Sequence, residues 1–150
     1  MDATVDTSRL LRVACPRCLA PNRLLATRAA DGPKCGRCGT PLLAGEPTVL
    51  DEQSFDAFAS RTDLPVIVDF WAPWCAPCRM MAPAFESAAR ELALSARFAK
   101  VDTDAAPELA RRFAIRSIPT LAMFKKGVEQ ARVSGAMDAR SLVRWINDKI

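Results

Sequence analysis

Runs of apolar residues, separated by polar and Pro/Gly-containing stretches, divide most of the chain into short strands and helices. Continuous apolar runs predict buried strands at residues 48–50, 65–71, 96–101 and 120–124. Apolar residues at helical spacing predict helices at residues 54–59, 76–94, 107–113 and from Asp138 onward. An alternating run at 128–133, joined to 120–124 by Lys125-Lys126-Gly127, predicts a hairpin. The order β-α-β-α-β-α-β-β-α predicts an α/β sandwich with a mixed central sheet flanked by helices.

A Pro- and Gly-containing connector at residues 41–47 marks a boundary in this pattern. It predicts a small N-terminal segment, residues 1–45, followed by a larger domain, residues 46–150. Residues 1–10 lack periodicity and predict a loosely docked terminus. They carry two acids and no apolar core, which does not fit a secretory signal, and no later run approaches the ~20 apolar residues of a membrane span. We therefore expect a cytoplasmic protein that does not enter a membrane.

The composition restricts the chemistry that the chain can perform. Hydrophobic residues make up 50% of the chain and charged residues 25%, which is typical of a globular protein. The chain contains no histidine. This excludes Cys-His and Ser-His nucleophilic catalysis and every histidine-ligated metal site. A site for a soft metal must therefore be built mainly from cysteine.

Four of the six cysteines form two Cys-x-x-Cys pairs in the N-terminal segment, Cys15/Cys18 and Cys35/Cys38. Sixteen residues separate Cys18 from Cys35, within the window of about 15–20 residues that is typical of four-cysteine zinc sites. Each pair can form a tight knuckle that supplies two sulfurs to one ion, and such a short segment would need metal to fold. Two disulfides, or free thiols in a flexible tail, are the alternatives. An iron-sulfur centre fits less well because its asymmetric spacing is missing.

The positive charge of the chain is concentrated in the same segment. Residues 1–45 hold seven basic and three acidic residues, whereas the remaining 14 basic and 14 acidic residues cancel. A basic segment is compatible with nucleic-acid binding. However, four thiolates around a divalent cation would reduce its net charge to about +2. No aromatic residue lies between Cys15 and Cys38 to stack on bases. Nucleic-acid binding is therefore not favoured.

The third Cys-x-x-Cys pair, Cys75 and Cys78, has a different setting. It follows the apolar run 65–71 and opens the predicted helix 76–94. A thiol at a helix N-terminus has a lowered pKa, because the helix dipole stabilises the thiolate. Cys78 lies one turn further on, close enough to form a disulfide with Cys75. The pair predicts thiol–disulfide exchange, with Cys75 attacking and Cys78 resolving; a structural disulfide or an inert buried pair is the alternative.

Several motifs resemble those of the thioredoxin family. They are Trp71-Ala72-Pro73-Trp74-Cys75-Ala76-Pro77-Cys78, Pro83, Ser117-Ile118-Pro119-Thr120, Phe124-Lys125-Lys126-Gly127 and Gly135. The cysteine-rich front is similar to that of the zinc-ribbon-bearing thioredoxin-2 type of bacteria. The resemblance implies a thioredoxin-like three-layer sandwich with a small zinc ribbon. It also implies a protein-disulfide reductase that binds one zinc ion and no organic cofactor, with protein disulfides as substrates and an NADPH-linked thioredoxin reductase as electron donor. We expect a monomer.

Two charged residues receive roles through this resemblance. Asp69 lies within the apolar run 65–71, where burial would raise its pKa. In the family, the matching carboxylate relays a proton for the second thiol, which implies that Asp69 serves Cys78. The alternative is a solvated aspartate at a strand end. Lys100, which we expect at the end of the next strand, matches a lysine that tunes this carboxylate; a surface lysine that only packs its stem is the alternative.

The remaining candidates form a surface for protein substrates. Ile118-Pro119 matches the family's cis-proline segment, which would pair with an extended substrate, and Gly135 matches a glycine lining the same groove. An ordinary trans proline and a plain turn glycine are the alternatives. Trp74 and Pro77 contribute an apolar surround to the dithiol. Ala76 departs from the family, which usually has Gly there, and this leaves the reduction potential open.

A second hypothesis assigns the main function to the N-terminal segment. Its thiolates could release zinc on oxidation and expose apolar surface, giving a redox-sensing module with a chaperone-like response.

Overall fold

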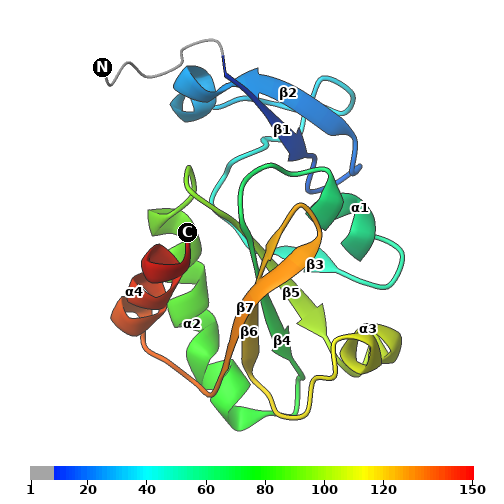
Figure 1. The fold of residues 1–150 in the computed structure, drawn as a ribbon, viewed down its shortest axis with the longest axis vertical. Helices are drawn as coiled ribbons and strands as arrows, with labels where there is room; N and C mark the ends of the chain where they lie inside the picture. The colour runs from blue at the N-terminus through cyan, green and yellow to red at the C-terminus, as the bar shows by residue number, and fades with distance from the viewer. Residues whose placement is uncertain (1–8) are drawn as a thin grey trace.

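The structure, a computed structural model, describes residues 9–150 (Figure 1). Most of the terminus that the sequence predicts to be loosely docked, residues 1–8, lies outside the described residues. For Leu10 that prediction is wrong, because Leu10 begins the first strand.

Five strands form the central sheet in the order β3-β5-β4-β6-β7. Strands β3, β5 and β4 are parallel, whereas β6 runs antiparallel to β4 and β7 antiparallel to β6, so the predicted mixed sheet is confirmed. The strands are β3 (Thr48–Leu50), β4 (Val66–Trp71), β5 (Arg97–Asp102), β6 (Thr120–Lys125) and β7 (Val128–Ser134).

Four α-helices cover the two faces of this sheet and complete three layers (Figure 1). They are α1 (Phe55–Ser60), α2 (Ala76–Glu91), α3 (Pro107–Arg112) and α4 (Ala139–Lys149). Helix α2 ends before the predicted residue 94, because the N–H groups of both Ser95 and Ala96 turn back to the carbonyl of Leu92. Within residues 9–150, no helix is long and apolar enough to cross a membrane.

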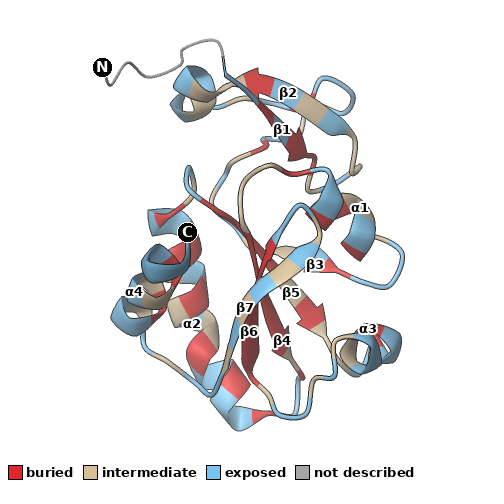
Figure 2. Cartoon of the chain, viewed as in Figure 1, coloured by how far each residue is buried: buried red, intermediate tan, exposed pale blue. Residues whose placement is uncertain are grey.

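Alternation along the strands divides the apolar side chains between two cores. In β4, Val66, Val68 and Phe70 face the core formed with α1 and α3. Ile67 faces the other core, formed with α2 and α4. The central strands β4 and β6 are almost wholly buried, whereas the edge strand β7 is not (Figure 2). Any polar side chain on β4 therefore lies in the interior.

The N-terminal segment forms its own small layer, with strands β1 (Leu10–Ala14) and β2 (Pro21–Leu25) and the 3-10 helix η1 (Ala26–Asp31). The two antiparallel strands were not predicted from the sequence, because each is only five residues long and carries exposed arginines. Its core contains few residues, namely Leu11, Val13, Cys15, Leu24, Cys35 and Leu42.

This segment, here called the ribbon (residues 9–45), docks on the larger domain through buried polar contacts. The guanidinium of Arg97, 6% exposed, donates to the Ala14 carbonyl at 3.0 Å and lies 4.7 Å from the centre of the Phe58 ring. The Ala14 N–H donates to the Thr62 hydroxyl at 3.1 Å. Burial lowers the pKa of Arg97 to about 10, and the facing Cys15 sulfur opposes this shift. The contacts lie at the starting ends of β4 and β5.

The connector between ribbon and domain approaches helix α2 closely at Gly45. This residue has φ +75°, and a Cβ there would lie 3.2 Å from both the Ala93 Cβ and the Arg90 Cα. Gly45→Ala should therefore destabilise the protein by more than the ~1–2 kcal/mol of a left-handed backbone alone. Gly32→Ala is the matched control, because Gly32 has φ +69° and nothing within 4 Å of its Cβ position. Urea denaturation of both variants tests this, and equal losses of stability would contradict it.

Candidate active site and metal centre

The dithiol lies where β4 leads into α2. Cys75 is the N-cap residue of α2 and is joined to Cys78 by a disulfide, with their Cα atoms 5.3 Å apart. The backbone N–H of Cys78 donates to the Cys75 sulfur at 3.2 Å. This N–H from the first turn of the helix and the helix dipole both favour negative charge on that sulfur. In the reduced protein, the same geometry stabilises a Cys75 thiolate.

An apolar surface surrounds the dithiol. Cys75 and Cys78 are buried together with Ala72 and pack against Trp71 and Ile118. Trp74 is 67% exposed, and its indole N–H donates to the Asp104 carboxylate at 2.9 Å. Pro77, in the first turn of α2, is also exposed. The indole is thus fixed at one edge while its face remains open to a partner.

Asp69 is fully buried in β4. Within the described residues, neither of its carboxylate oxygens has a hydrogen-bond partner. Burial raises the pKa of Asp69 to about 7, and the charge of Lys100 partly opposes this rise. Because strand residues alternate, Asp69 shares the face of Ile67, which α2 covers. The alternative of a solvated strand-end aspartate is therefore wrong.

Lys100 pairs directly with Asp69 in the register of β4 and β5. The sequence predicted it at a strand end, but β5 continues to Asp102, so Lys100 lies within the strand. Its ammonium is 4.5 Å from the centre of the Trp71 ring, on the same face of the sheet. The side chain is half-buried, and its charge acts on the Asp69 carboxylate.

The Ile118-Pro119 peptide bond is cis, so the alternative of an ordinary trans proline is wrong. The Ile118 carbonyl oxygen lies 3.8 Å from the Cys75 sulfur. Gly135, at φ +105°, donates its N–H to the Pro119 carbonyl at 2.9 Å. A segment 43 positions further along the chain thus meets the first cysteine of the dithiol. We call Ile118 and Pro119 the shelf.

The four ribbon cysteines converge on one point. All four sulfurs lie within 4.8 Å of one another, with Cys15 and Cys38 at 3.5 Å and Cys18 and Cys35 at 3.7 Å. Sulfurs around a tetrahedral zinc ion at ~2.3 Å would be about 3.8 Å apart. None of the four is in a disulfide. The donor set therefore fits a zinc ion, and the two-disulfide alternative does not describe this structure.

The two knuckles have the same backbone pattern. The N–H groups of Leu19 and Gly39 donate to the carbonyls of Cys15 and Cys35. The N–H groups of Arg17 and Arg37 donate to the sulfurs of the same two cysteines, both at 3.4 Å, and the Cys18 N–H donates to the Cys15 sulfur at the same distance. Gly39 adopts φ +79°, and Leu19 adopts φ +65° at the equivalent place. Leu19 packs against the core of the larger domain. The docking contact accounts for a leucine where the turn favours glycine.

Asn22 contacts the four-cysteine cluster, and it is not among the residues predicted from the sequence. Its amide donates to the Cys35 sulfur at 3.5 Å, and its carbonyl oxygen accepts from the Gly36 N–H at 2.9 Å. The Asn22 hydrogen bond, together with backbone N–H groups of Cys38 and Arg37, lowers the pKa of Cys35 to about 6. A lowered pKa favours the thiolate that a metal requires. Asn22 lies outside both Cys-x-x-Cys pairs, so no spacing rule identifies it.

A disulfide-forming pair lies at the N-cap of α2 within an open apolar surface, and the sheet face that α2 covers holds a buried carboxylate with no hydrogen-bond partner among the described residues. Together these features define a thiol–disulfide oxidoreductase. Comparison with known proteins agrees. The family model "Thioredoxin" matches residues 46–148, and the model "Thioredoxin 2, N-terminal", a zinc ribbon, matches residues 14–40. The chain belongs to the thioredoxin family.

Individual relatives cover most of the chain. Thioredoxin C-3 of Corynebacterium nephridii is 44% identical over 138 residues, covering 92% of this chain and 94% of that protein. The chloroplastic thioredoxin M-type of Zea mays is 38% identical over 134 residues, covering 89% and 79%. Among solved structures, a mutant thioredoxin from Halobacterium salinarum NRC-1 matches with a TM-score of 0.64 and 33% identity, covering 71% of this chain and 92% of that one.

Proposed function

We propose that this protein reduces disulfide bonds in other proteins, with Cys75 as the attacking thiolate and Cys78 as the resolving thiol. The Cys75 thiolate attacks one substrate sulfur, and the other substrate sulfur leaves as a thiolate. Cys78 then gives up its proton and attacks Cys75, which releases the second substrate thiolate. Two electrons pass to the substrate and the Cys75–Cys78 disulfide remains. The position of Cys75 at the N-cap of α2, where the Cys78 N–H meets its sulfur, carries this proposal.

Asp69 is proposed to accept the proton of Cys78. A carboxyl group with a pKa near 7 can both take up and return a proton at neutral pH. Its place on the face that α2 covers supports this role. Lys100 is proposed to tune the carboxylate, because its charge is the opposing influence on the Asp69 pKa.

The shelf, Gly135, Trp74 and Pro77 are proposed to hold the substrate. An extended segment could pair with the backbone of Ile118 while its sulfur approaches Cys75 3.8 Å away. The exposed indole and proline would contact apolar side chains of the same partner. We propose an NADPH-linked thioredoxin reductase as the donor that returns two electrons to the dithiol, and a monomer in the cytoplasm, where free thiols persist.

The ribbon is proposed to hold one zinc ion through Cys15, Cys18, Cys35 and Cys38. Zinc would supply the energy that orders a segment with so small a core. The boundary between ribbon and reductase domain is proposed at residues 45 and 46, directly after Gly45. No organic cofactor is required by the proposed reaction.

Trapping the mixed disulfide tests the roles of the two thiols. Reduced Cys78→Ser should accumulate a covalent adduct with a protein disulfide such as insulin, because the resolving thiol is gone. Cys75→Ser is the matched control and should form almost none, since Cys78 lies inside the first turn of α2 and lacks the N-cap position that stabilises a thiolate. Non-reducing electrophoresis reports the adduct. Equal trapping by both variants, or insulin left oxidised by the reduced wild type, would refute the proposal.

A further inference from the structure

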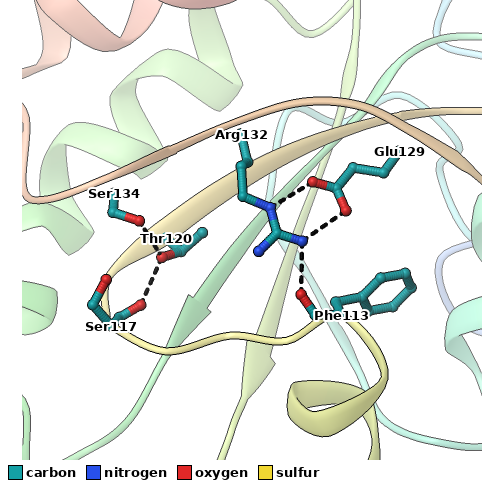
Figure 3. Close-up of polar contacts among 6 residues, drawn as sticks. All are labelled: Phe113, Ser117, Thr120, Glu129, Arg132 and Ser134. Atoms are coloured by element: carbon teal, nitrogen blue, oxygen red, sulfur yellow. Dashed lines mark hydrogen bonds and ion pairs between the residues drawn. The ribbon is translucent and has the colours of Figure 1, made fainter.

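The shelf belongs to a loop, residues 113–119, that connects α3 to β6 and has no regular structure of its own. Its position relative to Cys75 nevertheless decides whether a substrate paired with Ile118 can bring its sulfur to the attacking thiolate. Polar contacts from β7, the edge strand beside β6, hold this loop at both ends (Figure 3).

A chain of two hydroxyl groups fixes the end of the loop next to the shelf. Thr120 Oγ1 donates to the Ser117 carbonyl at 2.6 Å and lies 2.8 Å from Ser134 Oγ. A hydroxyl has one proton, and a carbonyl cannot donate. The Thr120 hydroxyl therefore donates its one proton to the Ser117 carbonyl. The Ser134 hydroxyl must be the donor in its hydrogen bond with Thr120. The register that pairs Thr120 with Ser134 across β6 and β7 places the two hydroxyls together.

An ion pair on the same strand fixes the other end of the loop. Arg132 donates to the Phe113 carbonyl at 2.7 Å, and its guanidinium meets both carboxylate oxygens of Glu129, at 2.6 and 2.8 Å. The Phe113 ring packs against Phe55 and Phe124 in the core. The start of the loop is thus anchored, so movement of the shelf must come from the end that the hydroxyl chain controls.

We propose that Ser134 is a positioning residue for the reduction of protein disulfides, because its hydroxyl orders Thr120 and thereby holds the Ser117 carbonyl and the shelf beside Cys75. This rests on the proposed function of the shelf. Ser134 is exposed, and its side-chain hydrogen bond within the described residues goes to Thr120 and to neither thiol, so its effect is confined to geometry. A protein substrate that pairs with the shelf depends on this geometry. A small disulfide that needs only the Cys75 sulfur does not.

Single-turnover kinetics of the pre-reduced, full-length protein can separate these cases. With insulin, Ser134→Ala should raise the half-saturating concentration about three- to tenfold, the effect expected for one neutral hydrogen bond, and leave the maximal rate within about twofold. With hydroxyethyl disulfide, the Ser134→Ala variant should react at the same rate as the wild type. Ser134→Thr keeps the hydroxyl and should restore wild-type behaviour toward insulin.

Two further variants keep the result interpretable. Gln130→Ala should change neither reaction. Gln130 lies on the same strand, and among the described residues its side chain makes a hydrogen bond only to the Val128 carbonyl. Arg132→Ala removes one anchor at the other end of the loop, where the Phe113 ring still packs in the core, and should weaken insulin binding less than Ser134→Ala does. Wild-type affinity for insulin in Ser134→Ala, an equal loss with both substrates, or failure of Ser134→Thr to restore would each overturn the inference. A wild type that does not reduce insulin would instead refute the proposed function.

Discussion

Asp69→Asn is expected to stabilise the oxidised protein by about 4 kcal/mol above pH 7 and to have little effect below pH 4. The folded carboxyl has a pKa of about 7, whereas in the unfolded chain it is about 3.9. Between about pH 4 and pH 7, Asp69 therefore keeps its proton in the folded state and loses it in the unfolded chain. Each of the roughly three pKa units costs the wild type about 1.4 kcal/mol. This cost grows between about pH 4 and pH 7 and is constant above.

Urea denaturation of the oxidised protein at pH 4, 6 and 8 would measure this effect. Asparagine has the same shape as aspartic acid and cannot ionise, so the two proteins should converge at low pH. Asp148→Asn, on the exposed side of α4, is the matched control and should stay within about 0.5 kcal/mol at every pH. A stabilisation by Asp69→Asn that is equal at pH 4 and pH 8 would show a packing effect and exclude a buried ionisable group.

The burial of Asp69 illustrates what the sequence could predict. An unbroken apolar run predicts a central strand, and a central strand buries both faces, so the environment of its one carboxylate follows. The start of α2 at the cysteine pair follows in the same way from the change of period after Trp71. The order of elements in the larger domain was predicted in the same way, from apolar runs for the strands and helical spacing for the helices.

The docking of the ribbon could not be predicted in this way. It depends on Arg97 reaching the Ala14 carbonyl, a contact between residues 83 positions apart. An arginine at the start of a strand carries no signal that it will be buried. The hydroxyl chain from Ser134 is similar, because it exists only once the register of β6 and β7 places Thr120 opposite Ser134. Local patterns identify elements, whereas pairings across the fold decide what these side chains do.

Removal of the proposed zinc ion is expected to unfold the ribbon and leave the reductase domain folded. Structural zinc sites contribute about 10–16 kcal/mol, and a segment of fewer than about 40 residues seldom folds without such help. Hydrogen exchange measured by mass spectrometry should show β1 and β2 losing their protection in a chelator and regaining it when zinc is restored. The strands of the central sheet should keep theirs, since their cores take only Ala14 and Leu19 from the described part of the ribbon.

Two variants test whether the loss of protection depends on the four ribbon cysteines. Cys38→Ser removes one ligand and should reproduce the effect of the chelator. The double variant Cys75→Ser/Cys78→Ser removes two thiols at the opposite end of the domain and should keep the ribbon protected. Ribbon strands that stay protected without zinc would mean that docking through Arg97 is sufficient to order them.

Insulin reduction by the same zinc-free protein tests whether the ribbon affects the reactivity of the dithiol. The ribbon contacts the starting ends of β4 and β5, whereas Cys75 follows the far end of β4, a strand of six residues. At about 3.3 Å per residue, this separates the two sites by roughly 20 Å. Insulin reduction should therefore stay within about twofold of the zinc-bound rate. A larger change would mean that the ribbon regulates the dithiol through the sheet. Arg97 would provide the connection, because it lies on the same strand as Lys100, the register partner of Asp69.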